Sequence, residues 1–174
     1  YYVIDLIDLE PVPPPLPQPV GSLSVRDFGA EGDGIADDTE AIQRCLNAGA
    51  EAKKTVFLPP GRYRTTRGFR VESVMVQGAG MWYSTIFNRR EDLNRKSAGV
   101  GFGVLGTSSF KDFAIYGDGT WRKDEEFAFW GTWGDGSVVE NVWIEKTQVG
   151  IWSGRDKQPV SKNLTVRNCR FRNV

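Results

Sequence analysis

Carboxylates and tryptophans are the side chains of this sequence that could do chemistry. The 174 residues contain no histidine, which excludes Ser-His and Cys-His nucleophile pairs and imidazole metal ligands. Catalysis would have to use carboxylic acids, and two of them about 6.5 to 9.5 Å apart perform inverting glycoside hydrolysis. In or near predicted turns lie Asp118, Asp124, Glu125, Glu126, Asp135, Glu145 and Asp156. For any one of them a solvated turn residue is the favoured interpretation.

The tryptophans offer a second chemistry, which is stacking on a sugar ring. Trp130 and Trp152 each follow an apolar residue in the segments "AFWG" and "GIWS". Because side chains alternate across a strand, the apolar residue would point inward and the indole outward. Trp130, Trp152 and nearby Trp133 are therefore predicted substrate-binding residues, with Asp135 as a hydrogen-bond partner for substrate hydroxyls. The alternative is that these rings cover one another or a loop.

The remaining aromatic and oxygen-rich segments carry weaker predictions. Trp121 and Trp143 are secondary candidates for sugar contact, whereas Trp82 and Tyr83 fall in a turn and are interpreted as structural. The turn "GDGT" (Gly117–Thr120) could hold a structural calcium ion, although four residues are far from a complete ligand set. No catalytic residue is assigned and no cofactor is required.

Composition limits the partners that the chain could bind. Twenty-two basic residues balance twenty-two acidic ones, so electrostatics gives no reason to expect nucleic acid or a charged membrane. No apolar run approaches the ~20 residues of a membrane-spanning helix. Cys45 and Cys169 lack the spacing of a metal site, and free thiols are favoured over a disulfide.

The composition of the sequence changes along the chain. Residues 1–10 read as a lone strand, which would be either the last strand of a preceding β-sandwich or an edge strand of the main domain. Residues 11–20 are a proline-rich linker, and residues 21–174 form the main domain. The chain starts at Tyr1 rather than at Met, so we expect it to be a piece of a longer protein with adjacent domains.

Short strands with a shared pattern recur through the main domain. The segments "SVMV", "DFAI", "NVWI" and "NCRF" begin at Ser73, Asp112, Asn141 and Asn168. The later intervals are nearly equal, and a looped-out insertion over Asn88–Gly101 would lengthen the first. Strand repeats of this length predict a solenoid, the parallel β-helix, with Asn141 and Asn168 stacked at one corner. A β-sandwich is the alternative fold.

The segment "VRDFGAEGDGIADDTEAIQ" (Val25–Gln43) predicts how this solenoid begins. A strand and a glycine-rich turn lead into an amphipathic helix over Asp38–Ala48, capped by Asp37 and stopped by Gly49. Such a helix covers the exposed end of a β-helix core. The acidic residues around its start complement the helix dipole and need no catalytic explanation.

This segment, continued by "KTVFLPPGRYRTT", resembles the opening of the pectate-lyase-like right-handed parallel β-helix superfamily. A closer resemblance joins "IDLEPV", the proline-rich joint, "GAGMWYSTI" (Gly78–Ile86) and "VRNCRFRNV". Together they are similar to the bacterial α-1,3-glucanase and mycodextranase family, and the resemblance covers essentially the whole chain. It implies an all-β fold, a right-handed parallel β-helix with an N-terminal capping helix, truncated at its C-terminal end.

The resemblance also implies an activity, although no catalytic residue can be transferred. It implies a secreted glycoside hydrolase that cleaves internal α-1,3-glucosidic bonds in a neutral glucan by an inverting two-carboxylate mechanism. The family's catalytic aspartates lie in Ala-Asp-Gly-Ile-Asn and Gly-Asp-Asp segments, which this sequence lacks. We therefore expect them beyond Val174 and expect this fragment alone to be inactive. The alternatives are a tailspike-like or adhesin-like glycan binder and a pectin-active β-helix enzyme.

Overall fold

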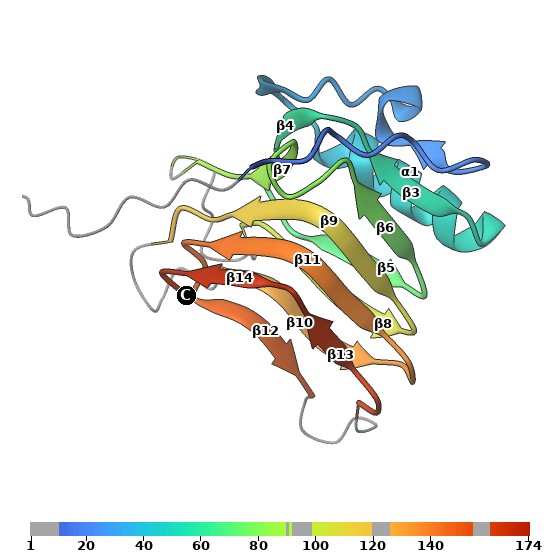
Figure 1. Cartoon of the computed structure of the whole chain (residues 1–174), viewed down its shortest axis with the longest axis vertical. Coiled ribbons are helices and arrows are strands. Elements are labelled where there is room, and N and C mark those ends of the chain that lie inside the picture. The colour runs from blue at the N-terminus through green and yellow to red at the C-terminus, as the bar shows by residue number, and fades with distance from the viewer. Residues whose placement is uncertain (1–10, 90, 92–98, 120–125, 155–160) are drawn as a thin grey trace, which may run out of the picture.

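Successive coils of the chain stack along one axis, and each strand pairs with its equivalent in the next coil (Figure 1). The computed structural model describes residues 11–89, 91, 99–119, 126–154 and 161–174. Every described strand pairing is parallel. Parallel pairing of equivalent strands in successive coils confirms the predicted parallel β-helix and excludes the β-sandwich, whose sheets are antiparallel.

The strands form three faces of the coil. The first face contains β1 (Leu23–Ser24), β3 (Thr55–Leu58), β6 (Met75–Gly78), β13 (Thr165–Arg167) and the first halves of β9 (Ser109–Tyr116) and β11 (Val138–Glu145). The second contains β2 (Asp33–Asp37), β4 (Gly61–Arg64), β7 (Ser84–Phe87), β14 (Arg170–Arg172) and the second halves of β9 and β11. The third contains β5 (Phe69–Glu72), β8 (Phe102–Gly106), β10 (Phe127–Trp133) and β12 (Val149–Ser153).

A corner of left-handed residues bends the chain from the first face to the second. Asp112, Asn141 and Asn168 have φ values of 62°, 52° and 53°, a region that Asn and Asp tolerate better than most residues. Asn141 Nδ2 donates a hydrogen bond to Asp112 Oδ1 at 3.0 Å. Asn141 and Asn168 therefore occupy the same corner, as predicted.

The first repeat in the sequence was assigned to the wrong corner. Val76 pairs with Phe110, so "SVMV" belongs to the first face, whereas "DFAI" begins the second. Strands on both faces show the same apolar pattern, which hides this difference. Thr85 pairs with Ala114, and the match to "DFAI" is "YSTI", beginning at Tyr83. The insertion over Asn88–Gly101 is not needed to explain the interval, and its residues 90 and 92–98 lie outside the described residues.

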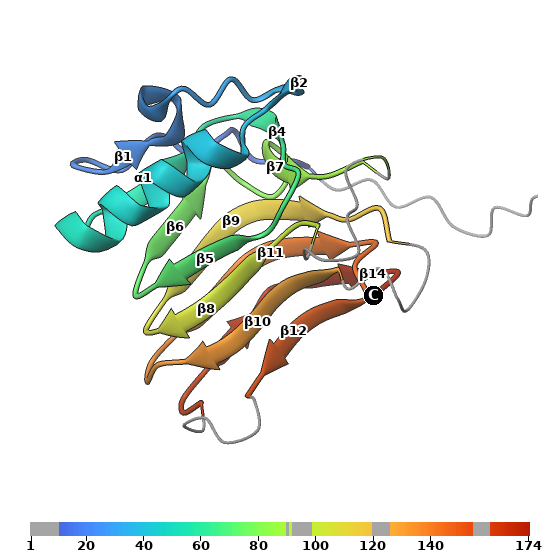
Figure 2. The ribbon, with the colours of Figure 1, turned by 180° about the vertical axis from the view of Figure 1, so that it is seen from behind.

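The helix α1 (Thr39–Ala52) covers the first coil on the third face. It follows β2 as β5 follows β4, so a helix occupies the place that strands take in later coils (Figure 2). It ends at Ala52, three residues beyond Gly49, and the C-cap residue Lys53 lies in the left-handed region. Gly49 does not stop the helix because it lies within it, against Val56. The capping helix was correctly predicted, and its C-terminal end was predicted too early.

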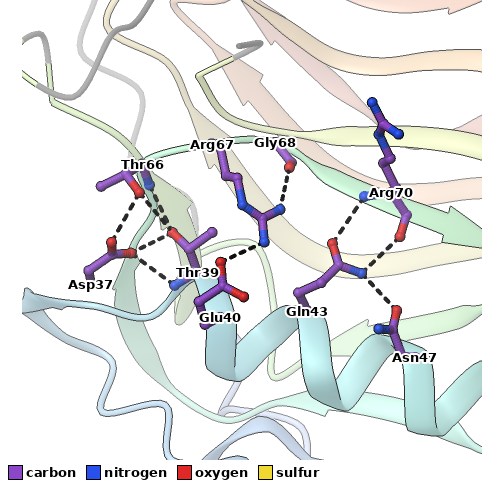
Figure 3. Close-up of polar contacts among 9 residues, drawn as sticks. All are labelled: Asp37, Thr39, Glu40, Gln43, Asn47, Thr66, Arg67, Gly68 and Arg70. Carbon is purple, nitrogen blue, oxygen red and sulfur yellow. Dashed lines mark hydrogen bonds and ion pairs between the residues drawn. The ribbon is translucent and has the colours of Figure 1, made fainter.

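Side chains of α1 replace the backbone groups of the missing strand (Figure 3). Gln43 Nε2 donates to Arg70 O at 2.9 Å, and Arg70 N donates to Gln43 Oε1 at 3.1 Å. Thr66 N donates to Thr39 Oγ1 at 2.9 Å, and Arg67 pairs with Glu40 at 2.7 Å. The backbone groups of Thr66 and Arg70 thereby find partners on the side of β5 that faces away from β8, where no strand lies.

The acidic residues before α1 bind backbone groups of the turn and of the first helical residue. The N-cap residue is Asp38 rather than the predicted Asp37, and its side chain makes no capping hydrogen bond. Asp38 is 1% exposed, and its carboxylate accepts hydrogen bonds from Glu31 N and Gly32 N at 2.7 and 3.2 Å. Asp37 accepts from Thr39 N at 3.0 Å. Asp37 thus binds the start of the helix while Asp38 binds the glycine-rich turn.

The proline-rich linker contacts the β-helix. Leu16 N donates to Ala79 O at 2.8 Å, and Tyr83 Oη donates to Pro13 O at 2.7 Å. Residues 1–10, predicted as a strand, lie outside the described residues. Cys45 and Cys169 are both free thiols. Among the described residues, none of the helices has the length and apolar character to span a membrane.

Candidate functional site

Trp130 and Trp152 lie side by side on the outside of the third face. They are directly paired in the parallel register of β10 and β12, and Trp152 is 53% exposed. The ring of Phe127 lies 6.2 Å from the ring of Trp130 and 5.6 Å from that of Trp152. We call Trp130 and Trp152 the tryptophan row. The two indoles form the adjacent outward pair that strand alternation predicts.

Gly103 forms the floor under the tryptophan row. It is paired with Trp130 in β8, and a Cβ at this position would lie 2.9 Å from the Trp130 ring. The indole therefore lies directly against the Gly103 backbone of the preceding coil, where a side chain would overlap it. The row consists of one ring supported by this glycine and one more exposed ring beside it.

Trp133 does not belong to the exposed row. Its side chain is 1% exposed and packs against Phe110 and Phe129, each with a ring-centroid distance of 5.8 Å. Trp133 lies four residues after Phe129 on β10. Because side chains alternate along a strand, it points inward as Phe129 does. Its selection relied on closeness in sequence to Trp130. A core position leaves its ring no free face for a sugar.

Asp135 is exposed just beyond β10. Its Oδ1 accepts a hydrogen bond from Asn163 Nδ2 at 2.6 Å. Asp135 lines an open depression of about 470 Å³, together with Leu105, Lys162 and Glu72. Glu72 gives no signal in the sequence because it ends β5, two strand pairings away from β10, and only the register brings the two carboxylates into one lining.

Two other carboxylates are buried rather than solvated. Glu126 is 0% exposed and Glu145 is 7% exposed. Burial, more than any other cause, raises the pKa of the Glu126 carboxyl group above its ordinary 4.5. Glu126 accepts hydrogen bonds from Asn88 Nδ2 and, at 2.9 Å, from Asp118 N. The interpretation as solvated turn residues is wrong for these two, and residues 124, 125 and 156 lie outside the described residues.

The turn that could have held calcium is bound by Glu126 instead. A Cβ at Gly119 would lie 2.5 Å from Glu126 Oε2, so the carboxylate lies directly against the turn. Among the residues that the structure describes, no group of three or more acidic or cysteine side chains could hold a metal ion. The GDG turn therefore uses its backbone N–H groups to bind an internal carboxylate.

Two tryptophans that the sequence does not single out as main sugar-binding candidates meet on the second face. Trp82 and Trp143 contact each other edge to face, with ring centroids 4.9 Å apart, and line a second cavity. They are 61 positions apart in the chain, so strand alternation gives no signal for this contact. Trp121 lies outside the described residues.

Comparison with protein families and with curated proteins finds similarity to polysaccharide-modifying proteins. The family described as rhamnogalacturonase A/epimerase, pectate lyase-like, matches residues 22–101. The mannuronan C5-epimerase AlgE6 of Azotobacter vinelandii is 31% identical over 162 residues, which cover 83% of this chain and 18% of that protein. The chain thus spans about a fifth of the length of this curated relative.

Two solved structures superpose over most of the chain. The catalytic unit of the GH87 α-1,3-glucanase from Streptomyces thermodiastaticus strain HF3-3 matches at 30% identity and a TM-score of 0.74, covering 91% of this chain and 32% of that one. The Agl-KA catalytic domain matches at 26% identity and a TM-score of 0.83, covering 92% of this chain and 30% of that one. Together with the stacked parallel strands, these matches show that the chain has a pectate-lyase-like parallel β-helix fold.

Proposed function

We propose that this chain contributes part of the substrate groove of a secreted polysaccharide hydrolase that cleaves internal α-1,3-glucosidic bonds. The observation that carries the proposal is the tryptophan row on the outside of the third face. It lies in a chain that matches an α-1,3-glucanase structure at 30% sequence identity, with 91% of this chain covered. An indole face offers a broad apolar surface to the C–H side of a pyranose. The balanced charge of the chain fits a neutral glucan better than an acidic polymer.

The chain's own residues would bind and orient the polysaccharide. Trp152 and Trp130 would stack on consecutive sugars, and Asp135 would accept hydrogen bonds from sugar hydroxyls. The inverting acid and base would be carboxylates of the larger part of the enzyme, since this chain covers 32% of the solved glucanase. The chain alone would then bind glucan without cleaving it.

The binding experiment compares Trp152→Ala with Met75→Ala on α-1,3-linked gluco-oligosaccharides. Met75 is also an exposed apolar residue, at 45%, but it lies on the first face. Loss of the Trp152 ring is expected to raise Kd about tenfold, equivalent to ~1.4 kcal/mol, while Met75→Ala leaves Kd unchanged. Affinities are measured by calorimetry. Equal affinities for the two variants and the wild type would show that the tryptophan row does not contact the glucan.

The activity experiment uses the full-length enzyme, with this chain as the control. Hydrolysis of α-1,3-glucan, and not of polygalacturonate, is expected from the full-length enzyme alone. Cleavage by the isolated chain would contradict the proposal that the catalytic carboxylates belong to the rest of the enzyme. Binding without turnover by the full-length protein would favour a glycan-binding role of the tailspike or adhesin kind.

An epimerase is the second candidate function. It is favoured by the 31% identity to the mannuronan C5-epimerase AlgE6 across 83% of the chain. The same assay would include mannuronan, with inversion at C5 followed by proton NMR. Epimerisation of mannuronan together with no release of glucose oligomers would replace the hydrolase proposal.

A further inference from the structure

The open depression of about 470 Å³ lies beside the tryptophan row, on the outside of the same third face. Thr132 follows Trp130 by two residues on β10, so the two side chains are on the same side of the strand, about 6.6 Å apart along it. The pairing of β10 with β8, and of β8 with β5, places Leu105 and Glu72 in line with Thr132. The depression therefore continues the surface that carries the two indoles.

The depression combines an apolar side chain with several polar ones. Leu105 is 52% exposed, and the side chains of Glu72, Asp135 and Lys162 in the same lining are exposed as well. Apolar surface with a few polar groups, in a volume of about 300 to 1,000 Å³, is the usual composition of a small-ligand site. Because these four side chains are accessible, a ligand in the depression can contact them directly.

The turns that follow β8 and β10 hold one side of the depression in place. Gly134 N donates a hydrogen bond to Gly106 O at 2.8 Å, and a Cβ at Gly134 would lie 2.4 Å from Thr107 N. The Asp135 side chain is held in turn by Asn163, whose Nδ2 lies 2.6 Å from Asp135 Oδ1. Polar groups that are already ordered lower the entropic cost of binding.

The charges of the depression select among sugars. Its lining contains the carboxylates of Glu72 and Asp135 and the ammonium group of Lys162. Sugar hydroxyls can donate to the carboxylates and accept from the ammonium group, and the C–H groups of a pyranose can cover the Leu105 side chain. A uronic acid would bring a third carboxylate beside two others, and like charges repel at such distances. A neutral sugar therefore fits better than an acidic one.

We propose that this depression is a further sugar subsite, which takes one neutral hexose of a glucan bound on the tryptophan row and disfavours uronic acids through Glu72 and Asp135. The inference rests on the proposed function, because the glucan must lie on Trp130 and Trp152 for its next sugar to enter the depression. It adds Leu105 as the apolar contact of that sugar. It also gives a physical basis for distinguishing a neutral glucan from mannuronan.

The test follows the Leu105 methyl groups and the Trp152 ring of the same chain by NMR. Leucine methyl groups carry ¹³C and tryptophans carry fluorine at ring position 5, and Leu105→Ile and Trp152→Phe variants assign the two resonances. The probes are the α-1,3-linked glucose trisaccharide, a mannuronan trisaccharide and calcium chloride. We expect the glucose trisaccharide to shift both resonances with one Kd of about 1 mM, and the mannuronan trisaccharide to bind about tenfold more weakly. Calcium should leave the Leu105 resonance unchanged.

Two variants test the apolar and the charged parts of the subsite. Leu105→Ala is expected to raise the Kd of the glucose trisaccharide about fivefold, because the sugar loses its apolar contact. Glu72→Gln keeps the size of the side chain and removes its charge, so the mannuronan trisaccharide should bind about fivefold more tightly, while the Kd of the glucose trisaccharide changes less than about twofold. Glu51→Gln removes the same charge from an exposed position of α1 and is the control, which should change neither Kd. Thermal denaturation checks that the variants are folded.

The outcomes separate the subsite from the proposed function. A shifted Trp152 resonance with an unshifted Leu105 resonance in excess glucose trisaccharide would overturn the subsite and leave the tryptophan row in place. If neither resonance shifts, both proposals fail. A Leu105 shift with calcium and not with sugar would overturn the subsite as well, since the carboxylates would then form a cation site. Equal affinities of the wild type for the glucose and mannuronan trisaccharides would contradict the selection by charge.

Discussion

At the level of the single residue, Glu126 is a buried carboxyl group that connects two successive coils, because Asn88 follows β7 and Asp118 follows β9. It receives hydrogen bonds from Asn88 Nδ2 and Asp118 N and lies against Gly119. Burial raises its pKa while these donors act in the opposite direction. The protonated form is therefore favoured on folding, although its partners match a carboxylate.

The stability of the protein is expected to fall as pH rises through the folded-state pKa of Glu126. An acid whose pKa is raised by folding contributes stability that is complete below its unfolded value, 4.5 here, and is lost above it. Glu126→Gln cannot ionise. The free energy of unfolding of this variant minus that of the wild type should therefore increase between pH of about 4 and 7, as measured by chemical denaturation. A flat difference would contradict the raised pKa.

Truncation of the same side chain should have the opposite effect at neutral pH. Glu126→Ala leaves Asn88 Nδ2 and the Asp118 N–H buried without their acceptor. We expect a loss of about 1 to 3 kcal/mol in the free energy of unfolding. Glu126→Gln is the matched control because its amide oxygen can still accept from the turn, and its N–H can donate to Asn88 Oδ1 once the Asn88 amide has turned over. Equal stability of the two variants would show that the hydrogen bonds contribute nothing.

At the level of the element, α1 acts as a substitute for a strand. Its apolar stripe, Ala41, Ile42, Cys45 and Leu46, is buried, and its polar side chains bond the edge of β5. An exposed strand edge is a site for aggregation, and covering it is a known protection. The helix therefore closes both the core and the hydrogen-bond ladder at this end.

Removal of the Gln43 amide is expected to expose the edge of β5. Gln43→Ala loses the bonds to Arg70 N and Arg70 O, at about 1 to 2 kcal/mol for the pair. Gln43→Glu keeps the acceptor for Arg70 N and should be intermediate. Denaturation measures the loss, and light scattering should show faster aggregation of the alanine variant. Wild-type stability and aggregation rate of Gln43→Ala would mean that water satisfies the backbone groups of Arg70 equally well.

Gly49→Ala should destabilise the protein even though alanine favours helices by about 1 kcal/mol over glycine. The added Cβ would overlap Val56 Cγ2 and lie 3.1 Å from Lys54 O. Overpacking of a tight core costs about 1 to 3 kcal/mol or more, so the clash outweighs the propensity. Glu51→Ala, at an exposed position of the same helix, is the control. Stabilisation by Gly49→Ala would show that α1 can move away from β3.

At the level of the whole molecule, aromatic rings connect successive coils through the centre. The Phe102 ring lies 5.2 Å from Phe69, 4.9 Å from Phe110, 6.0 Å from Phe113 and 5.7 Å from Phe129. Phe69 and Phe129 belong to the coils on either side. In a solenoid each unit contacts its neighbours, so stability depends on these contacts between coils.

Phe102→Ala is expected to lower the free energy of unfolding by about 3 to 5 kcal/mol. Phe102 is 0% exposed, so the substitution leaves a buried cavity and removes ring contacts with two neighbouring coils at once. Leu105→Ala, on the same strand at 52% exposure, should change stability by roughly 0.5 kcal/mol or less. Denaturation of both variants measures the contrast. A small effect for Phe102→Ala would show that the coils are less dependent on one another than the ring contacts indicate.

The sequence alone determined the parallel β-helix, its helical cap and the pairing of Trp130 with Trp152. These features depend on local periodicity: the alternation of a strand, the stripe of α1 and the recurring corner residues. The same alternation also places Trp133 in the core, where the structure has it. Properties that repeat within one strand or one coil can be read without knowing how long each turn is.

Only the tertiary structure decided which residues outside the repeated strand segments meet across coils. The contacts of Asn88 with Glu126 and of Trp82 with Trp143 depend on how many residues each turn contains. Turn length shifts the register of whole coils and leaves no periodic signal, as the misplaced Ser73 repeat illustrates. The cavity on the second face was therefore hidden in the sequence, because stacking of unequal coils creates it.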